Sequence, residues 1–345
     1  MCEDDEPKSI VSFSLVIAGS IISIVSIFNN VLLFIALLRN NRCFKCYFHF
    51  ILALCFFDII VSVCYMPVIL VDSLKDWTKW VELARAWWPF FVYGLTLTNV
   101  SMTTASFILV AILYERYLIT VRSYILKQFQ TKRSLWCFLC LLLGILTKGG
   151  MFLELDVFPN EDETCKNTVL EYEVGMTEIS QSLWYGNVYK FWIRNIVTVF
   201  LPFFLLLTIN LQIVLELRKR MNRELSIGSR QRFSSKMQSK TNVKQATATM
   251  LFICVIYLIC NATNVFITAW EFIDIKSLQD EFIIPYMLSA DISSVLVVTA
   301  CALRLPIYML CNPELRRTIK RSFTHRIEHQ QKLQDTFSLI TKILV

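Results

Sequence analysis

Apolar residues in this 345-residue chain gather in seven long runs, separated by short polar segments. Each run is long enough to cross a hydrocarbon layer of about 30 Å as a helix. Asp291 and Arg304 interrupt the last run, so six spans plus one buried segment is the alternative. We predict an all-α membrane protein, a seven-transmembrane helix bundle with spans at approximately 11–38, 47–71, 87–114, 135–153, 191–217, 246–270 and 282–310.

Charge orients the predicted bundle in the membrane. Lysine and arginine gather after the first, third, fifth and seventh runs, and aspartate and glutamate gather in the loops between. Basic loops favour the cytoplasmic side. We therefore expect a multi-pass plasma-membrane protein, embedded in the lipid bilayer, with an extracellular amino terminus. The basic residues lie in four short segments beside the spans, which is a poor pattern for a nucleic-acid-binding protein.

The ends of the chain are short. Residues 1–10 are the predicted extracellular amino terminus, 11–310 the transmembrane domain, and 311–345 a cytoplasmic amphipathic helix and tail. Leu315, Ile319 and Phe323 recur every four residues and share one face of that short helix. Cys311 at its start is a candidate for palmitoylation, with a plain buried cysteine as the alternative. The acidic start of the chain lacks the basic front of a signal peptide.

Five short motifs follow one another along the runs. Ionisable residues among them are expensive within a membrane and are usually functional. Their order and spacing resemble the rhodopsin-like G-protein-coupled receptors over essentially the whole chain. The resemblance implies an agonist receptor that couples to a heterotrimeric G protein, with arrestin as a further candidate partner. The motifs are Asn30-Val31-Leu32, Leu54-Cys55-Phe56-Phe57-Asp58, Glu115-Arg116-Tyr117, Pro202 and Tyr308.

The resemblance also implies a switch. Arg116 would be held by Glu115 in the inactive state and would meet the G protein when released. Tyr117 and Tyr308 complete the implied switch. The chain departs from the common pattern where Asn261 replaces a tryptophan and Thr263 replaces a proline in the sixth span, which removes a proline kink.

The seventh span departs most. If the motif is anchored on Tyr308, Arg304 stands where the family usually has asparagine, facing the second-span aspartate. The alternative register is anchored on Pro306. In the first register, which we favour, Arg304 neutralises Asp58 in place of a sodium ion. We therefore expect sodium-insensitive ligand binding and an intramembrane polar network of Asn30, Asp58, Asn261 and Arg304.

Four stretches resemble the FMRFamide-type neuropeptide receptors of invertebrates: Phe90–Leu95, Phe152–Leu155, Leu201–Leu211 and Leu258–Asn261. This implies an extracellular peptide agonist that is short, amidated and carries arginine. Acidic residues in the outer segments would attract its cation. Aromatic residues at these depths also form interfacial belts, so only part of the set is expected to bind ligand. The candidates are Tyr93, Asn99, Glu154, Trp184, Trp192, Trp270, Glu271 and Asp291.

The resemblance also bears on the pairing of the cysteines in the outer segments. Phe91 occupies the place where most rhodopsin-like receptors have the cysteine that ties the third span to the outer loop. Cys2 and Cys165 are the cysteines in outer segments, and an outside pair can form a disulfide. We predict a Cys2–Cys165 disulfide.

The sequence also bears on three other functions. A chemosensory receptor for a small molecule would share the scaffold, whereas a transporter would need repeats or broken helices with paired charges. An enzyme is disfavoured because His49, His325 and His329 are the three histidines and none neighbours a plausible nucleophile or metal cluster. No catalytic residue, metal site or cofactor is predicted.

Overall fold

The computed structural model describes residues 10–39, 48–226, 235–273 and 282–311, together with 316, 317 and 319. Within these residues, seven helical segments are long and apolar enough to cross a membrane. The predicted fold class is therefore confirmed. The segments are Ile10–Leu38, His49–Thr78, Val81–Val121, Arg133–Glu154, Ile196–Arg220, Thr247–Ile273 and Ile283–Cys311.

The third segment is longer than its apolar run. Hydropathy identifies only the part of a helix that lies in hydrocarbon. The backbone hydrogen bonds of the helix continue until a residue adopts non-helical φ and ψ angles. Here the helix continues to Val121 and ends where Arg122 adopts a positive φ of 55°. The left-handed residue lets the last carbonyls find donors, since the Arg122 amide donates to the carbonyls of Leu118 and Ile119.

Several spans are built from more than one helical element. The second combines α2 (Phe48–Tyr65), the π-helical η2 (Met66–Leu70) and α3 (Val71–Thr78). The fifth begins with the π-helical η4 (Leu183–Ile193) and η5 (Ile196–Phe200) before α9 (Leu201–Ser226). Pro67 and Pro202 lie at these irregular places, because proline lacks the amide that would continue a regular ladder.

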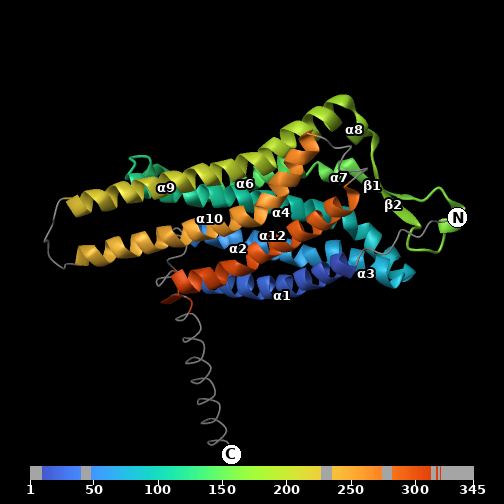
Figure 1. The fold of residues 1–345 in the computed structure, drawn as a ribbon, viewed down its shortest axis with the longest axis horizontal. Coiled ribbons are helices and arrows are strands. Elements are labelled where there is room, and N and C mark those ends of the chain that lie inside the picture. Colours follow the sequence, from blue (N-terminus) through green and yellow to red (C-terminus); the bar gives the residue numbers. More distant parts are fainter. Residues whose placement is uncertain are drawn as a thin grey trace, which may run out of the picture.

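The remaining spans are mostly continuous helices, and Figure 1 shows them lying lengthwise beside one another. The helix α4 packs against α2, α6 and α9, whereas α1 packs between α2 and α12. Their bounds are α1 (Ile10–Leu38), α4 (Val81–Val121), α6 (Arg133–Lys148), α7 (Met151–Glu154), α10 (Ser235–Ile273) and α12 (Ile283–Cys311). Shorter elements are α5 (Leu126–Thr131), η3 (Glu163–Cys165) and α8 (Glu178–Gln181).

A two-stranded antiparallel hairpin lies at one end of the bundle, which we call the hairpin end (Figure 1). It consists of β1 (Leu155–Pro159) and β2 (Tyr172–Met176). Phe158 pairs with Glu173, and Asp156 lies two residues before Phe158, so these three side chains share one face. We call the opposite end of the bundle, where Arg116 lies, the Arg116 end.

The apolar core fills the half of the bundle toward the Arg116 end. Its fully buried side chains come from α1, α2, α4, α9, α10 and α12. They include Leu33, Leu54, Leu113, Ile213 and Tyr308. Packing of this density resists continuous deformation, so polar groups above it occupy fixed positions.

The predictions for the amphipathic helix and for the disulfide fall wholly or partly outside the described residues. The amphipathic helix after the seventh span is not described as an element. Cys311, the lipidation candidate, is half-buried at the end of α12 and is a free thiol. Cys165 is buried and disulfide-bonded. Its proposed partner Cys2 lies outside the described residues, so the Cys2–Cys165 pairing stays a prediction.

Candidate functional site

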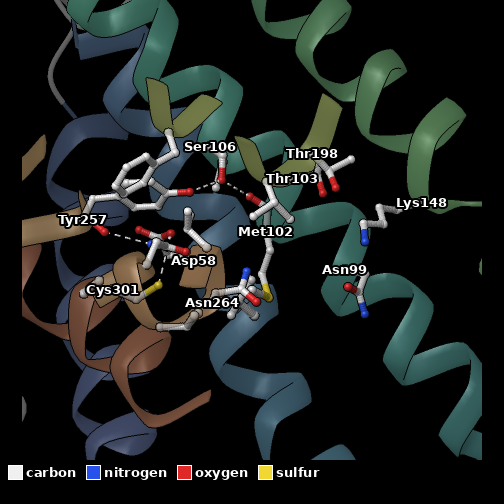
Figure 2. A pocket seen from close by; sticks show the side chains of 18 of the residues that line it. Asp58, Asn99, Met102, Thr103, Ser106, Lys148, Thr198, Tyr257, Asn264 and Cys301 are labelled. Carbon is white, nitrogen blue, oxygen red and sulfur yellow. Dashed lines mark hydrogen bonds between the residues drawn. The ribbon is translucent and has the colours of Figure 1, made fainter. Parts of the chain in front are cut away.

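A cavity lies in the hairpin half of the bundle, directly above the apolar core. Its empty space is about 770 Å³, a figure that includes the solvent at its open mouth. Helices α2, α4, α6, α10 and α12 line it together with η5 and α9. Its polar lining residues are Asp58, Asn99, Thr103, Ser106, Lys148, Thr198, Tyr257, Asn261, Asn264 and Arg304 (Figure 2).

The lining includes a buried ion pair between α2 and α12. The guanidinium Nη1 of Arg304 donates to Oδ2 of Asp58, and the two side chains are 4% and 1% exposed. The thiol of Cys301 donates to the other carboxylate oxygen at 3.5 Å. The structure thus brings Arg304 and Asp58 into contact, as expected for the register anchored on Tyr308.

The first span joins this network through amides and hydroxyls. The Asn30 side chain donates to the backbone carbonyls of Ser26 at 2.9 Å and Cys301 at 3.2 Å. Asn29 donates to the carbonyl of Ala302 at 3.0 Å, although the family usually has glycine at that place. The hydroxyls of Ser26 and Ser62 lie 2.8 Å apart. Small hydroxyl side chains allow close helix contact within membranes, so α1, α2 and α12 form a tight polar seam.

The sixth span connects to the third within the cavity wall. The hydroxyls of Tyr257 and Ser106 lie 2.5 Å apart. Asn261 donates to the backbone carbonyl of Tyr257 at 2.9 Å and lines the cavity. It therefore lines the same cavity as Asp58 and Arg304, and its membership of their polar network stays a prediction.

The carboxylate of Glu115 is bound by two residues that lie beyond α4. Arg133, the first residue of α6, pairs with it, and the amide of Gln130 in α5 donates to it at 3.1 Å. The expected hold of Glu115 on Arg116 stays a prediction.

Other members of the predicted switch lie near this end of α4. Arg116 is buried at 4% exposure, and Tyr117 stacks on Tyr114 with ring centroids 6.4 Å apart. The Tyr308 side chain is fully buried, and among the described residues its hydroxyl has no hydrogen-bond partner. Arg220 of α9 donates to the carbonyl of Thr120. The fifth span is thereby attached to the end of the third.

Of the eight candidate ligand-binding residues, the cavity lining includes Asn99 alone. Glu154 is 1% exposed and is held by Arg194, whose Nη1 lies 2.6 and 2.7 Å from its two oxygens. The Tyr185 hydroxyl donates to the same carboxylate at 2.9 Å. Glu154 therefore joins the end of the fourth span to the start of the fifth, and its role in ligand binding stays a prediction.

The other candidates make contacts of their own outside the cavity lining. Glu271 accepts a hydrogen bond from Tyr286 at 2.8 Å, and Asp291 accepts one from Ser12. The aromatic candidates pack against neighbouring rings or are largely exposed, as an interfacial belt would be. They are Tyr93 against Phe152, Trp192 against Phe272, Trp270 against Phe266 and Phe282, and Trp184, which is 79% exposed.

Two charged residues escaped the sequence reasoning. Lys148 lines the cavity, and Arg194 neutralises Glu154. Both lie inside predicted apolar runs, 135–153 and 191–217. An ionisable residue within a span normally faces the bundle interior, so their position in the sequence was the signal that could have found them.

One comparison with known proteins identifies a family. The family model described as "7 transmembrane receptor (rhodopsin family)" matches residues 29–306 of this chain. The matched range is most of the chain and contains Asp58, the Glu115-Arg116-Tyr117 triplet and Arg304. No curated protein matches the chain.

Proposed function

Since the chain belongs to the rhodopsin family of seven-transmembrane receptors and couples an extracellular agonist to a heterotrimeric G protein, we propose that the agonist is a short amidated peptide. The four stretches that resemble FMRFamide-type receptors support this choice. The cavity supports it as well, since several side-chain amides line its wall and can hydrogen-bond a peptide backbone or a terminal amide.

The observation that carries the proposal is the acidic hairpin. Residues 155–176 contain six carboxylates and one lysine. Asp156 and Glu173 are exposed and share one face of the two strands. A surface of one charge sign raises the local concentration of the opposite charge and speeds its binding. The arginine of a peptide agonist is therefore placed at the hairpin.

We place the amino terminus and the hairpin outside the cell, and the Arg116 end inside. In this orientation Glu115, Arg116, Tyr117 and Tyr308 form the G-protein switch, and Arg133 also pairs with Glu115. Arrestin would use the same opened end. An epitope tag at the amino terminus should be stained on intact cells, and staining only after permeabilisation would contradict the orientation.

The Asp58–Arg304 pair replaces the sodium ion in this proposal. The guanidinium already supplies the positive charge that a cation would bring to the Asp58 carboxylate. We expect agonist affinity to be the same in sodium and in N-methyl-glucamine buffers of equal ionic strength. Sodium dependence in the native receptor that disappears in Arg304→Leu would contradict this assignment.

A signalling screen tests the agonist. Cells expressing the receptor are treated with amidated peptides ending in Arg-Phe, and calcium and cyclic AMP are measured. Peptides with citrulline in place of arginine are the matched controls, because they keep the shape and lose the charge. We expect the arginine peptides to be more potent, and Asp156→Asn with Glu173→Gln to remove that advantage. Responses to small volatile or water-soluble compounds alone would favour the chemosensory alternative.

The Cys2–Cys165 disulfide remains part of the proposal. Reduction followed by alkylation of a proteolytic digest should release a peptide containing Cys2 from one containing Cys165. Detection of Cys165 linked to any other cysteine would contradict the pairing.

A further inference from the structure

Lys148 is the last residue of α6, a helix that buries few of its residues in the bundle. The one residue of α6 that is buried is Gly144, and a side chain at Gly144 would collide with Thr104 of α4. Residues four apart lie on the same face of a helix. Lys148 therefore continues the face that packs on α4, and this brings its side chain into the cavity lining.

The ammonium group of Lys148 makes no hydrogen bond and no ion pair with any described residue. Arg194, Glu154 and Glu271 lie within electrostatic range of it. Glu154 is already paired with Arg194, and Glu271 accepts the hydroxyl of Tyr286. Within the lining, Asp58 and Arg304 neutralise each other. Lys148 is thus the one charged residue of the lining that forms no ion pair with a described residue.

A second donor without a partner lies on the same side of the cavity. The Thr198 hydroxyl is buried, its residue is 8% exposed, and it has no hydrogen-bond partner among the described residues. In Figure 2 the ammonium end of Lys148 is directed toward Thr198 and Asn99, and Asp58 lies at the far side of the pocket. An oxyanion can accept from an ammonium and a hydroxyl at once, and such charge-assisted bonds are strong.

An unpaired lysine within a span is costly to keep, and the cost is offset when a ligand brings the opposite charge. We infer that the agonist carries a carboxylate and that Lys148 and Thr198 bind it in the cavity. This inference rests on the proposed function, because it takes the cavity as the agonist site. The agonist would then have a cationic part at the acidic hairpin and an acidic part at Lys148.

Binding of small probes tests the site directly. The purified full-length receptor is unfolded thermally with a thiol-reactive dye, since eight of its described cysteines are free. Two matched probe pairs are compared: acetyl-Phe-Asp-amide with acetyl-Phe-Asn-amide, and acetyl-phenylalanine with its amide. The first pair reports a side-chain carboxylate and the second a terminal one. We expect the acid of at least one pair to raise the Tm and its neutral partner to do so only at about 10- to 100-fold higher concentration.

Three variants assign the effect to Lys148. Lys148→Met should lose the preference for the acid, and Lys148→Arg should keep it. Lys127→Met, a change of an exposed lysine at the Arg116 end, should leave it unaltered. Lys148→Met should also raise the Tm of the ligand-free receptor, because it removes an unpaired charge; a lower Tm would show that the lysine has a structural partner and would overturn the inference.

Other outcomes also overturn it. Equal responses to acid and amide in the native receptor, or an acid preference that survives in Lys148→Met, would exclude the proposed site. So would stabilisation by sodium chloride matching that by the probes at equal concentration, because a simple halide would then account for the cavity's charge. Signalling separates this failure from that of the proposed function. Activation by neutral amidated peptides with unchanged potency in Lys148→Met would retain the peptide receptor and exclude the acidic subsite.

Discussion

Among the arginine–carboxylate pairs that join distant segments of this receptor, one lies inside the bundle and another at its hairpin end. Arg304 and Asp58 are 4% and 1% exposed, whereas Arg85 of α4 and Glu171 before β2 are 38% and 21% exposed. The bonding chemistry is the same, and Arg85 even adds a 2.7 Å bond to Asn167. The burial of each pair decides how much it stabilises the protein, because water cannot solvate a buried charge that has lost its partner. The interior pair should therefore fix the arrangement of the helices, whereas the outer pair should contribute little to stability.

Breaking the interior pair gives the largest expected effect. Arg304→Leu leaves the Asp58 carboxylate unpaired in the bundle. We expect the free energy of unfolding to fall by about 3–5 kcal/mol, measured on purified receptor by thermal or denaturant unfolding.

The double variant Asp58→Leu with Arg304→Leu is the informative control. Replacing a buried pair by apolar side chains is often neutral, so the double variant should regain most of the lost stability. Arg39→Leu, a change of an exposed arginine just beyond α1, should have little effect. A double variant as unstable as Arg304→Leu alone would mean that the pair does more than neutralise charge.

The next largest effect is expected at Glu154, where two helical segments meet near the hairpin end. Glu154→Gln weakens charge-assisted bonds to Arg194 and leaves that guanidinium buried. We expect a loss of about 1.5–3 kcal/mol in the ligand-free receptor. Asp156→Asn, two residues away and exposed, should leave stability unchanged while lowering the potency of a cationic peptide. If Glu154→Gln changed potency and not stability, Glu154 would be a ligand contact after all.

A smaller coupling is expected between Glu115 and Arg133 at the Arg116 end. Arg133 is 11% exposed, so water partly replaces a lost partner. A double-mutant cycle of Glu115→Gln and Arg133→Gln should give a coupling of about 1–2 kcal/mol, between typical values for exposed and buried pairs. The parallel cycle with Arg116→Gln should be closer to additive, because adjacent residues on a helix point about 100° apart. A larger coupling with Arg116 than with Arg133 would support the Glu115–Arg116 lock.

The helix bundle could be predicted from the sequence because each span is identified by its own apolar run. About 18 or more apolar residues must cross the membrane whatever their neighbours do, so the seven spans could be identified without knowing the packing. The contact of Arg304 with Asp58 was predicted too, from the resemblance that places Arg304 opposite the second-span aspartate.

The rest of the site could not be predicted, because the spacing of residues along the sequence does not show where a side chain points or which helix lies beside it. Arg133 reaches Glu115 because α5 turns the chain back toward α4. Likewise Arg194 pairs with Glu154 across forty residues of sequence, and its role as a partner was not predicted. Lys148 is brought to the cavity by the close approach that Gly144 permits, and a single sequence does not show that approach.

The exposed Arg85–Glu171 pair should give the smallest effect, and it would sharpen the comparison most. Arg85→Gln should leave the Tm unchanged in physiological salt, because exposed ion pairs often contribute nothing measurable. At low ionic strength, amide hydrogen exchange around residues 167–171 should be faster in the variant than in the native receptor, whereas Lys127→Gln should not change it. The difference should vanish near 1 M salt, where the screening length is about 3 Å. A difference in exchange rate that persisted at high salt would show that Arg85 holds the hairpin by its hydrogen-bond geometry. The outer pair would then help to tie the third span to the outer loop, as a disulfide does in most rhodopsin-like receptors.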